Sequence, residues 1–286
     1  MSARPKKSLG QHFLAEHSYI DRIVRVIAPR TDDFVLEIGP GEGALTLPLL
    51  AAAGRLTAIE LDTDLIPGLR QRAQGVGALE IIHADLLQVD LTALAREHGV
   101  GRLRIAGNLP YYISSPILFH CMQHLAVIAD MHFMLQKEVV ARMAAAPGSK
   151  VYGRLSVMLQ LACAVEPLFD VPASAFRPPP KVDSAVVRLL PLPAQTRHDA
   201  NADDVHAVVK AAFAQRRKTL SNALGKLLDA DAIRQADVDP RARAETLAPT
   251  AFVRLAKVLA ARRADGDSGA TSRPIVTAQA VQSGHD

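Results

Sequence analysis

The chain has 286 residues and a mass of 30.7 kDa, and 49% of its residues are hydrophobic and 22% are charged. These values are close to those of folded globular proteins, so they exclude a disordered, collagen-like or coiled-coil chain as the overall class. The formal net charge of +4 is small, so the position of the charge along the chain is more informative than its size.

Apolar, strand-like runs alternate with helix-like stretches between residues 34 and 136. Repeated strand and helix units of this kind build a parallel sheet with helices packed on it. The predicted strands cover 34–38, 55–60, 79–84, 102–107 and 131–136, and the predicted helices cover 44–53, 63–73, 91–98 and 116–125. Another strand is expected over 182–190, after three prolines at 178–180. The pattern predicts an α/β fold.

The composition changes after Pro193, where alanine, leucine and basic residues replace β-branched runs. Apolar residues then recur at helical spacing, first around Phe213, Leu220 and Leu224 and again at Phe252, Leu255 and Leu259. We therefore predict three parts: a catalytic α/β domain over 1–194, a small all-helical domain over 195–263, and a disordered tail over 264–286 that lacks any periodicity.

The positive charge is concentrated in the predicted helical domain. Residues 197–263 contain 13 Lys and Arg against 8 Asp and Glu, whereas residues 1–196 are nearly balanced. Arg216, Arg217 and Lys218 follow one another in a stretch with a helical pattern, so we expect them to contact RNA phosphates. A basic helix that faces only solvent fits the charge alone equally well.

The sequence indicates a reduced, intracellular environment. Cys121 and Cys163 lie in apolar stretches without the spacing of a metal site, so both are interpreted as free thiols in the core. No apolar run reaches the length of a membrane span, and the basic N-terminus is not followed by a signal-peptide core. We expect a cytoplasmic protein that binds no membrane and no metal.

A glycine-rich segment, EIGPGEG over 37–43, lies between a predicted buried strand and a predicted helix. Glycines at this position let the chain turn sharply and let a ligand lie against bare backbone. Such a loop serves NAD, FAD or S-adenosylmethionine, or is a plain turn. The G-x-G-x-G spacing from Gly39, and the acidic Glu37 before it, favour a methyltransferase over a dinucleotide enzyme.

Two further carboxylates end predicted strands. Glu60 ends the second strand, where an acidic side chain can accept hydrogen bonds from both hydroxyls of a ribose. Asp85 follows the third strand, where a carboxylate can accept a hydrogen bond from an adenine amine. Each residue alone is a weak indication of a ligand site. Together with the glycine-rich segment after the first strand, they place three strand ends in register, which predicts a pocket for an adenosine group.

The motif Asn108-Leu109-Pro110-Tyr111 follows the fourth predicted strand. An adenine amine is a poor nucleophile because its lone pair is delocalised into the ring. The side-chain oxygen of Asn108 and the backbone carbonyl of Leu109 can together accept its protons, and Pro110 restricts Leu109 to an extended conformation. Tyr111 offers a ring on which a flipped base can stack. A turn with a buried tyrosine is the structural alternative.

The chain resembles the ribosomal RNA adenine N6,N6-dimethyltransferases, in particular the enzymes of the small subunit. The resemblance runs from residue 6 to about residue 260 and follows the family's motifs in order: KSLGQHFL, EIGPGEGALT, AIELD, HAD, GNLPYYISSP, MLQKEVVARM, YGRLSVMLQ, FRPPPKVDSAVVRL and FAQRRKTLSNAL. It implies a Rossmann-like class I methyltransferase sheet.

The resemblance also implies particular residue roles. The cofactor is S-adenosylmethionine, and the matching cofactor positions are His12, Leu14, Gly39, Glu60, Asp85 and Asn108. His12 replaces the asparagine of many members, and its imidazole can still donate a hydrogen bond. The family also places a phenylalanine against the flipped adenine, and Phe176 matches it. Without the resemblance, Phe176 would be interpreted as a core residue.

The implied reaction is dimethylation of two adjacent adenines in the 3′-terminal hairpin loop of 16S rRNA, in an immature small subunit, by a monomer. A large-subunit methylase of the macrolide-resistance type would share the pocket, although the FAQRRKTLSNAL segment favours the small-subunit enzyme. A catalytically silent RNA-binding assembly factor is the alternative from another class, and the intact NLPY motif argues against it. A nicotinamide dehydrogenase fits poorly because no hydride chemistry follows the fourth strand.

Overall fold

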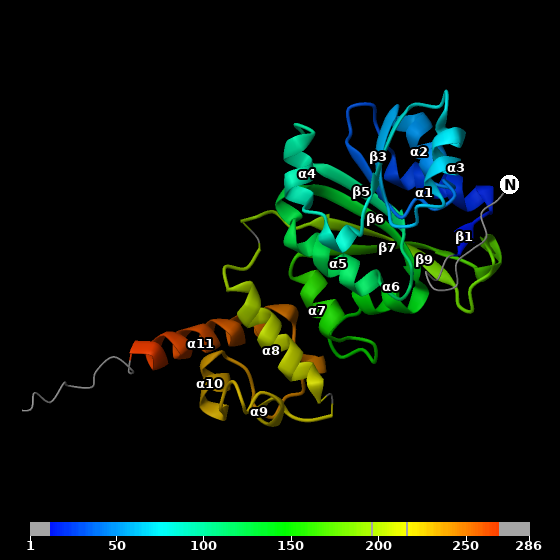
Figure 1. Cartoon of the computed structure of the whole chain (residues 1–286). Helices are drawn as coiled ribbons and strands as arrows, with labels where there is room; N and C mark the ends of the chain where they lie inside the picture. The colour runs from blue at the N-terminus through cyan, green and yellow to red at the C-terminus, as the bar shows by residue number, and fades with distance from the viewer. Residues whose placement is uncertain (1–11, 196, 216, 269–286) are drawn as a thin grey trace, which may run out of the picture. The chain divides into compact units, whose positions relative to one another are not determined.

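The computed structural model describes residues 12–195, 197–215 and 217–268, and a seven-stranded sheet organises its N-terminal part (Figure 1). The spatial order of the strands is β4-β3-β2-β5-β6-β9-β7. Their bounds are β2 (Val35–Ile38), β3 (Arg55–Glu60), β4 (Ala78–His83), β5 (Leu103–Asn108), β6 (Ile128–Gln136), β7 (Cys163–Val171) and β9 (Ser184–Pro191). Strands β2 to β6 pair in parallel, and β9 pairs antiparallel with both β6 and β7. The predicted α/β class is confirmed.

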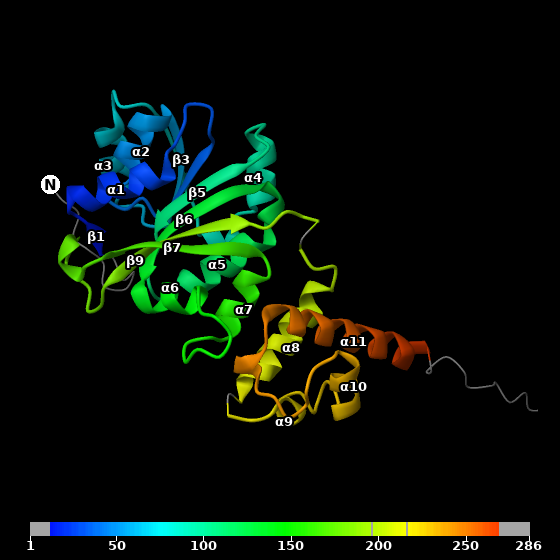
Figure 2. The same ribbon diagram turned by 180° about the vertical axis from the view of Figure 1, so that it is seen from behind.

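Helices cover both faces of this sheet because successive side chains of a strand point to opposite sides. Val35 packs into one core with α1, α2 and α3, and Leu36 packs into another with α4, α5, α6 and α7 (Figure 1, Figure 2). The bounds are α1 (His17–Ile27), α2 (Thr46–Ala53), α3 (Ile66–Ala73), α4 (Leu91–Glu97), α5 (Ser114–Gln123), α6 (Lys137–Met143) and α7 (Arg154–Gln160), with short 3₁₀ helices η2 (Leu86–Gln88), η3 (Leu125–Val127) and η4 (Ala173–Ala175).

A second, two-stranded sheet joins β1 (Phe13–Leu14) to β8 (Phe176–Arg177) in antiparallel register. Phe13 lies opposite Arg177 and Leu14 lies opposite Phe176. The backbone N–H groups of Ala15 and Glu16 both donate to the carbonyl of Ala175, which extends the junction. The segment before α1 is therefore held against a loop more than 160 residues later in the chain.

The thiols lie where the sequence predicted. Cys121 and Cys163 are both buried and free, and burial raises the pKa of each to about 12. A thiol with such a high pKa is neutral and unreactive at physiological pH. In the described part of the chain, no helix has the length and hydropathy needed to span a bilayer.

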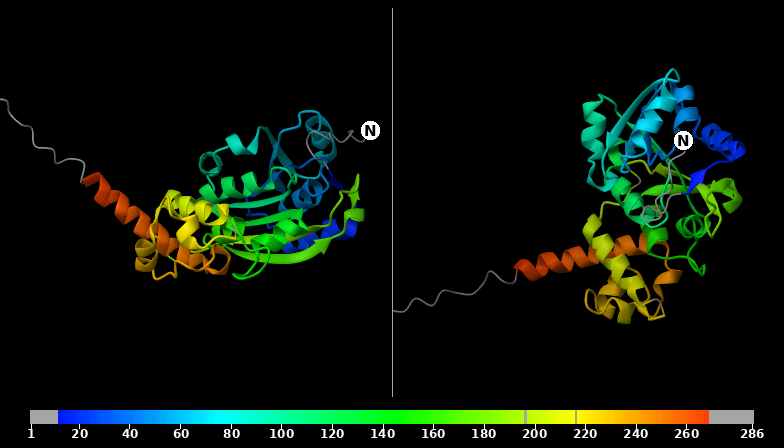
Figure 3. Two further views of the ribbon diagram at one scale, coloured as in Figure 1. Left: turned by 90° about the horizontal axis from the view of Figure 1, so that it is seen from below. Right: turned by 45° about the vertical axis from the view of Figure 1, so that its right-hand side comes forward.

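The chain divides into two structural units between His198 and Asp199, and the second unit is helical. Its elements are α8 (Ala202–Ala214), α9 (Leu220–Ala223), α10 (Ala230–Gln235), η5 (Ala244–Thr246) and α11 (Pro249–Ser268). Within this unit, the yellow α8 packs against the orange and red α11 (Figure 3). Phe252, Leu255 and Leu259 of α11 are buried, as their spacing predicted.

Two expectations about the helical unit need correction. The helix α11 continues past residue 263 to Ser268, and Arg262 and Arg263 in its later turns form ion pairs with Asp229 and Asp204. These ion pairs stabilise the later turns of the helix, where the apolar residues no longer recur at helical spacing. Residues 269–286 of the expected tail lie outside the described residues.

The second correction concerns Arg217 and Lys218, which do not lie on a helix. Helix α8 ends at Ala214 and α9 begins at Leu220, so Arg217 and Lys218 occupy the turn between them. The N–H groups of Leu220 and Ser221 donate to the carbonyls of Ala242 and Pro240, respectively. These tertiary hydrogen bonds replace the bonds that a continuous helix would make. Arg216 lies outside the described residues.

Candidate functional site

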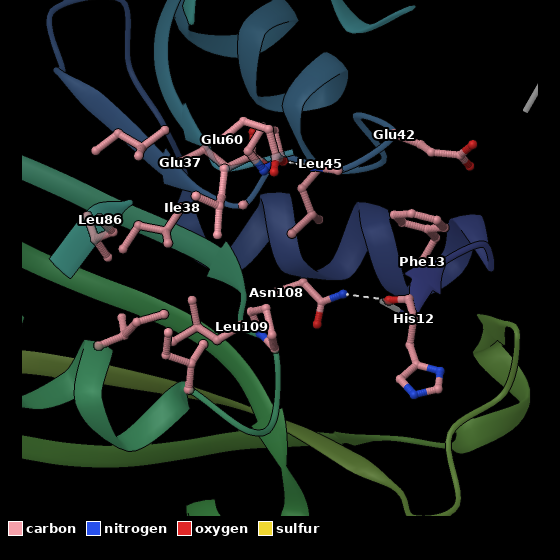
Figure 4. A pocket seen from close by; sticks show the side chains of 18 of the residues that line it. His12, Phe13, Glu37, Ile38, Glu42, Leu45, Glu60, Leu86, Asn108 and Leu109 are labelled. Carbon is pink, nitrogen blue, oxygen red and sulfur yellow. Dashed lines mark hydrogen bonds between the residues drawn. The ribbon is translucent and has the colours of Figure 1, made fainter. Parts of the chain in front are cut away.

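A pocket lies at the carboxyl ends of β2, β3 and β5 in the N-terminal unit (Figure 4). Strand β2 is the point where the order of the parallel strands reverses, and ligands of open α/β sheets bind at such a point. All the predicted cofactor residues line this pocket, together with the rest of the NLPY motif: His12, Leu14, Gly39, Glu60, Asp85, Asn108, Leu109, Pro110 and Tyr111.

The glycine-rich loop forms one wall of the pocket. Gly39 and Gly41 have φ angles of 65° and 56°, which are in the left-handed region that favours glycine. A Cβ on Gly39 would meet no atom within 4 Å, whereas one on Gly41 would approach the Phe13 ring to 3.0 Å. The loop therefore presents bare backbone to the pocket and lets Phe13, which also lines it, pack closely.

Glu60 connects the glycine-rich loop with the end of β3. Its carboxylate accepts hydrogen bonds from the N–H of Gly41 at 3.1 Å and of Asp62 at 2.8 Å. The residue is only 6% exposed, and burial raises its pKa although these two bonds oppose the shift. A carboxylate has about four acceptor positions, so acceptor capacity remains for a hydroxyl group such as those of a ribose.

The sequence marks Glu37 only as the acidic residue before the glycines and predicts no role for it. In the structure, Glu37 lines the pocket. It is buried on β2, and its Oε2 has no hydrogen-bond partner among the described residues. Burial raises its pKa to about 8. An unpartnered carboxyl oxygen beside a pocket is stabilised by a cationic ligand. S-adenosylmethionine carries a sulfonium and an ammonium group, so the residues present fit this cofactor.

Asp85 and its neighbours form the side of the pocket near β4. One Asp85 oxygen accepts a hydrogen bond from the N–H of Leu87 at 3.0 Å and caps the short helix η2. The carboxylate keeps further acceptor positions for an amine. Leu86, Ile38 and Ile117 add apolar surface to the same pocket, which suits the faces of a flat ring.

Asn108, the last residue of β5, has its side-chain amide held in one orientation. Its Nδ2 donates to the backbone carbonyl of His12 at 3.0 Å, as the dashed line in Figure 4 marks. The Oδ1 atom accepts no hydrogen bond from the described residues, and neither does the carbonyl of Leu109. The N–H of Leu109 donates to the carbonyl of Met134 on β6 at 3.1 Å and so anchors the motif to the sheet. Two adjacent acceptors are therefore available.

Tyr111 and His12 support each other beside these acceptors. The Tyr111 hydroxyl is hydrogen-bonded to Ser184 Oγ at 2.7 Å. Its ring stacks on the His12 imidazole with centroids 5.9 Å apart and an interplanar angle of 28°. Nδ1 of His12 donates to the Pro178 carbonyl at 2.8 Å. The His12 side chain thus joins Tyr111 to the proline loop, and its backbone carbonyl orients Asn108.

Phe176 is not brought to the pocket with the other predicted residues. It is 2% exposed and packs in the core cluster that contains Leu14 and Ile20. The cause is the pairing of β8 with β1, in which Phe176 lies opposite Leu14. In this structure Phe176 is a core residue, and contact with a flipped base would require its side chain to move.

Arg217 and Lys218 lie in the helical unit, and both are exposed. Neither forms an ion pair with a described residue, whereas Lys257 and Arg262 of the same unit pair with Asp199 and Asp229. The two turn residues therefore keep their charge for an external anion. Among the described residues, no group of His, Cys, Asp and Glu is arranged to hold a metal ion.

Comparison with known proteins identifies the family of the chain. The chain matches the family model described as ribosomal RNA adenine dimethylase over residues 2–261. It is 60% identical over 257 residues to ribosomal RNA small subunit methyltransferase A of Xanthomonas oryzae pv. oryzae (strain PXO99A), which covers 90% of this chain and 97% of that protein. The protein of the same name from Xylella fastidiosa (strain Temecula1) is 57% identical over 88% of this chain and 94% of its own length.

Two solved structures share the fold over most of the chain. A dimethyladenosine transferase from Plasmodium falciparum superposes with a TM-score of 0.72 at 27% identity and covers 85% of this chain and 96% of its own. The 23S rRNA methyltransferase ErmE superposes with a TM-score of 0.65 at 26% identity and covers 87% and 99%, respectively. The sequence matches and the shared class I methyltransferase fold show that the chain belongs to the ribosomal RNA adenine dimethylase family.

Proposed function

We propose that the protein transfers methyl groups from S-adenosylmethionine to N6 of two adjacent adenines in the 3′-terminal hairpin loop of 16S rRNA, in the immature small subunit. The arrangement of Asn108 carries this proposal, because its Nδ2 is bonded to the His12 carbonyl and its Oδ1 is left as an acceptor beside the Leu109 carbonyl. The names of the 60% and 57% identical relatives support the small subunit as the source of the substrate.

Two acceptors suit the two protons of an adenine amine. When Asn108 Oδ1 and the Leu109 carbonyl each hold one N–H, the nitrogen lone pair turns out of the ring plane and towards the cofactor side of the pocket. When bound, S-adenosylmethionine supplies the electrophilic methyl group. An in-line displacement of this kind depends chiefly on alignment, which the anchored backbone of Leu109 provides.

The same acceptors also suit a second methylation. The monomethylated amine retains one N–H, which one of the two acceptors can hold while the other loses its hydrogen bond. No general base is needed before the transfer, because the nitrogen becomes acidic once it has been alkylated and then releases its proton to water. The Tyr111 ring, fixed by Ser184 and His12, would lie against the flipped base.

RNA binding is assigned to the turn between α8 and α9. Arg217 and Lys218 there have no competing carboxylate among the described residues, and we include Arg216 with them from the sequence. Each phosphate contact adds to the salt dependence of RNA binding. We further propose that the protein acts as a monomer in the cytoplasm.

Transfer of labelled methyl groups to isolated ribosomal subunits tests the proposal. We expect label in small subunits that lack the modification, located at the two adjacent adenines. Label confined to large subunits would favour a large-subunit methylase, for which the fold shared with ErmE provides a specific precedent. Failure to bind S-adenosylmethionine would favour a silent assembly factor.

A further inference from the structure

Tyr112 is the most exposed of the large hydrophobic side chains among the described residues, at 58%. It nevertheless lines the pocket that holds Asn108 and Leu109. An aromatic ring left in water beside a binding site is a common feature of surfaces that receive a ligand, because its apolar faces gain free energy when they are covered. Neither the sequence motif nor the family roles given above assign a function to this second tyrosine.

The two rings to which contact with the flipped base is assigned, Tyr111 and Phe176, have partners already. Tyr111 stacks on His12 and bonds Ser184, and Phe176 is buried in the core. Tyr112 makes no hydrogen bond, ion pair or ring contact with any described residue. It is therefore the ring of the NLPYY segment that no described side chain stacks on or bonds.

The backbone around Tyr112 is ordered by hydrogen bonds on both sides. The N–H of Ile113 donates to the carbonyl of Pro110 at 3.2 Å, and Ser114 Oγ donates to the carbonyl of Tyr111 at 3.2 Å. Helix α5 begins directly afterwards, at Ser114. The ring is thus presented from a fixed turn, so little backbone freedom would be lost when a ligand covers it.

We propose that Tyr112 is a stacking platform for the base that neighbours the target adenine in the RNA strand. This inference rests on the proposed function. A strand that delivers one flipped base against Asn108 and Leu109 leaves the adjoining base at the mouth of the pocket, where it has lost a stacking neighbour. An exposed aromatic ring can replace that neighbour, and it does so for any base because every base has a flat face.

Steady-state methyl transfer to unmodified small subunits separates this role from contact with the cofactor. Base stacking on an aromatic side chain is worth about 1 to 3 kcal/mol, so Tyr112→Ala should raise the KM for the subunit by about 5- to 150-fold. The Kd for S-adenosylmethionine, measured by calorimetry, should stay within about twofold. Tyr112→Phe should restore the wild-type KM because it keeps the ring. Val151→Ala, at a 42% exposed position that does not line the pocket, is the matched control.

Three other outcomes would contradict either the stacking role of Tyr112 or the proposed function. An active wild-type enzyme with an unchanged KM in Tyr112→Ala would overturn the stacking role and leave the proposed function intact. A Kd for S-adenosylmethionine that rises in proportion to the loss would assign Tyr112 to the cofactor and also overturn it. A wild-type enzyme that methylates no rRNA would overturn the proposed function itself.

Discussion

The side-chain amide of Asn108 donates to the backbone carbonyl of His12, with a distance of 3.0 Å between nitrogen and oxygen. This bond links the end of β5 to the segment that enters β1, and the two residues are 96 positions apart in the chain. It selects one of the two possible orientations of the amide, with its oxygen as the unused acceptor. The N-terminal segment therefore contributes to the proposed reaction through its backbone.

Glu60→Ala should weaken the binding of S-adenosylmethionine by about 10- to 150-fold, which is the usual range for hydrogen bonds to a charged group. The variant removes the proposed ribose acceptor and the bonds that hold Gly41 and Asp62. Isothermal calorimetry measures the change. Glu80→Ala is the matched control, because Glu80 accepts from Thr57 on the neighbouring strand but does not line the pocket. An unchanged Kd for Glu60→Ala would remove the ribose role.

Glu37→Gln should reduce the pH dependence of stability of the ligand-free protein. The folded pKa of about 8 exceeds the ordinary value of 4.5, so over this window the unfolded chain binds fewer protons than the folded one. Stability therefore falls as the pH rises from 4.5 to 8. Thermal unfolding between pH 5 and pH 8 should show a smaller fall in Tm for Glu37→Gln than for the wild type. Glu97→Gln, at an exposed position, serves as the control. An equal fall of Tm with pH in Glu37→Gln and in the wild type would show that the pKa of Glu37 is not raised in the folded protein.

Arg104→Ala should destabilise the fold by about 3 to 5 kcal/mol. The Arg104 guanidinium lies 2.6 Å from Asp33 and 2.8 Å from Asp130, and it also donates to the carbonyl of Ile27 at the end of α1. Removing it leaves two largely buried carboxylates without their partner. Urea unfolding measures the loss.

The control for this experiment is Arg188→Ala, which breaks an exposed ion pair with Glu166. Exposed pairs contribute about 1 kcal/mol or less, so the control should remain near the wild type. If both variants lowered the free energy of unfolding equally, the ion pairs of Arg104 would stabilise the fold no more than an exposed pair does.

The sequence predicted the parts of the site that local motifs encode. A strand ending at Glu60, a strand next to Asn108 and the glycine-rich turn after β2 follow from short-range patterns of apolar residues and glycine. Their side chains converge because parallel strands share one carboxyl edge. The resemblance to the rRNA adenine dimethyltransferases is confirmed by the family match, and with it the class I methyltransferase fold and S-adenosylmethionine as methyl donor.

Features that depend on long-range pairing were missed. Strand β7 contains Pro167, which reads as a strand breaker, yet the proline is tolerated because β7 is at the edge of the sheet and its register shifts there. The pairing of β1 with β8 buries Phe176. The backbone hydrogen bonds from Leu220 and Ser221 to a later loop stand where the sequence pattern predicted a continuous helix. None of these contacts leaves a periodic signal in the sequence.

Single-turnover transfer by Asn108→Ala shows whether Asn108 Oδ1 and the Leu109 carbonyl jointly hold the adenine amine. The variant, saturated with S-adenosylmethionine and unmodified small subunits, should transfer the first methyl group at least about 100-fold more slowly than the wild type, since a lost alignment contact costs about this factor. Its Tm should stay close to the wild-type value, and saturation with S-adenosylmethionine keeps any loss of cofactor affinity out of the measured rate. A transfer rate within about twofold of the wild type would show that Asn108 does not hold the adenine amine during the transfer.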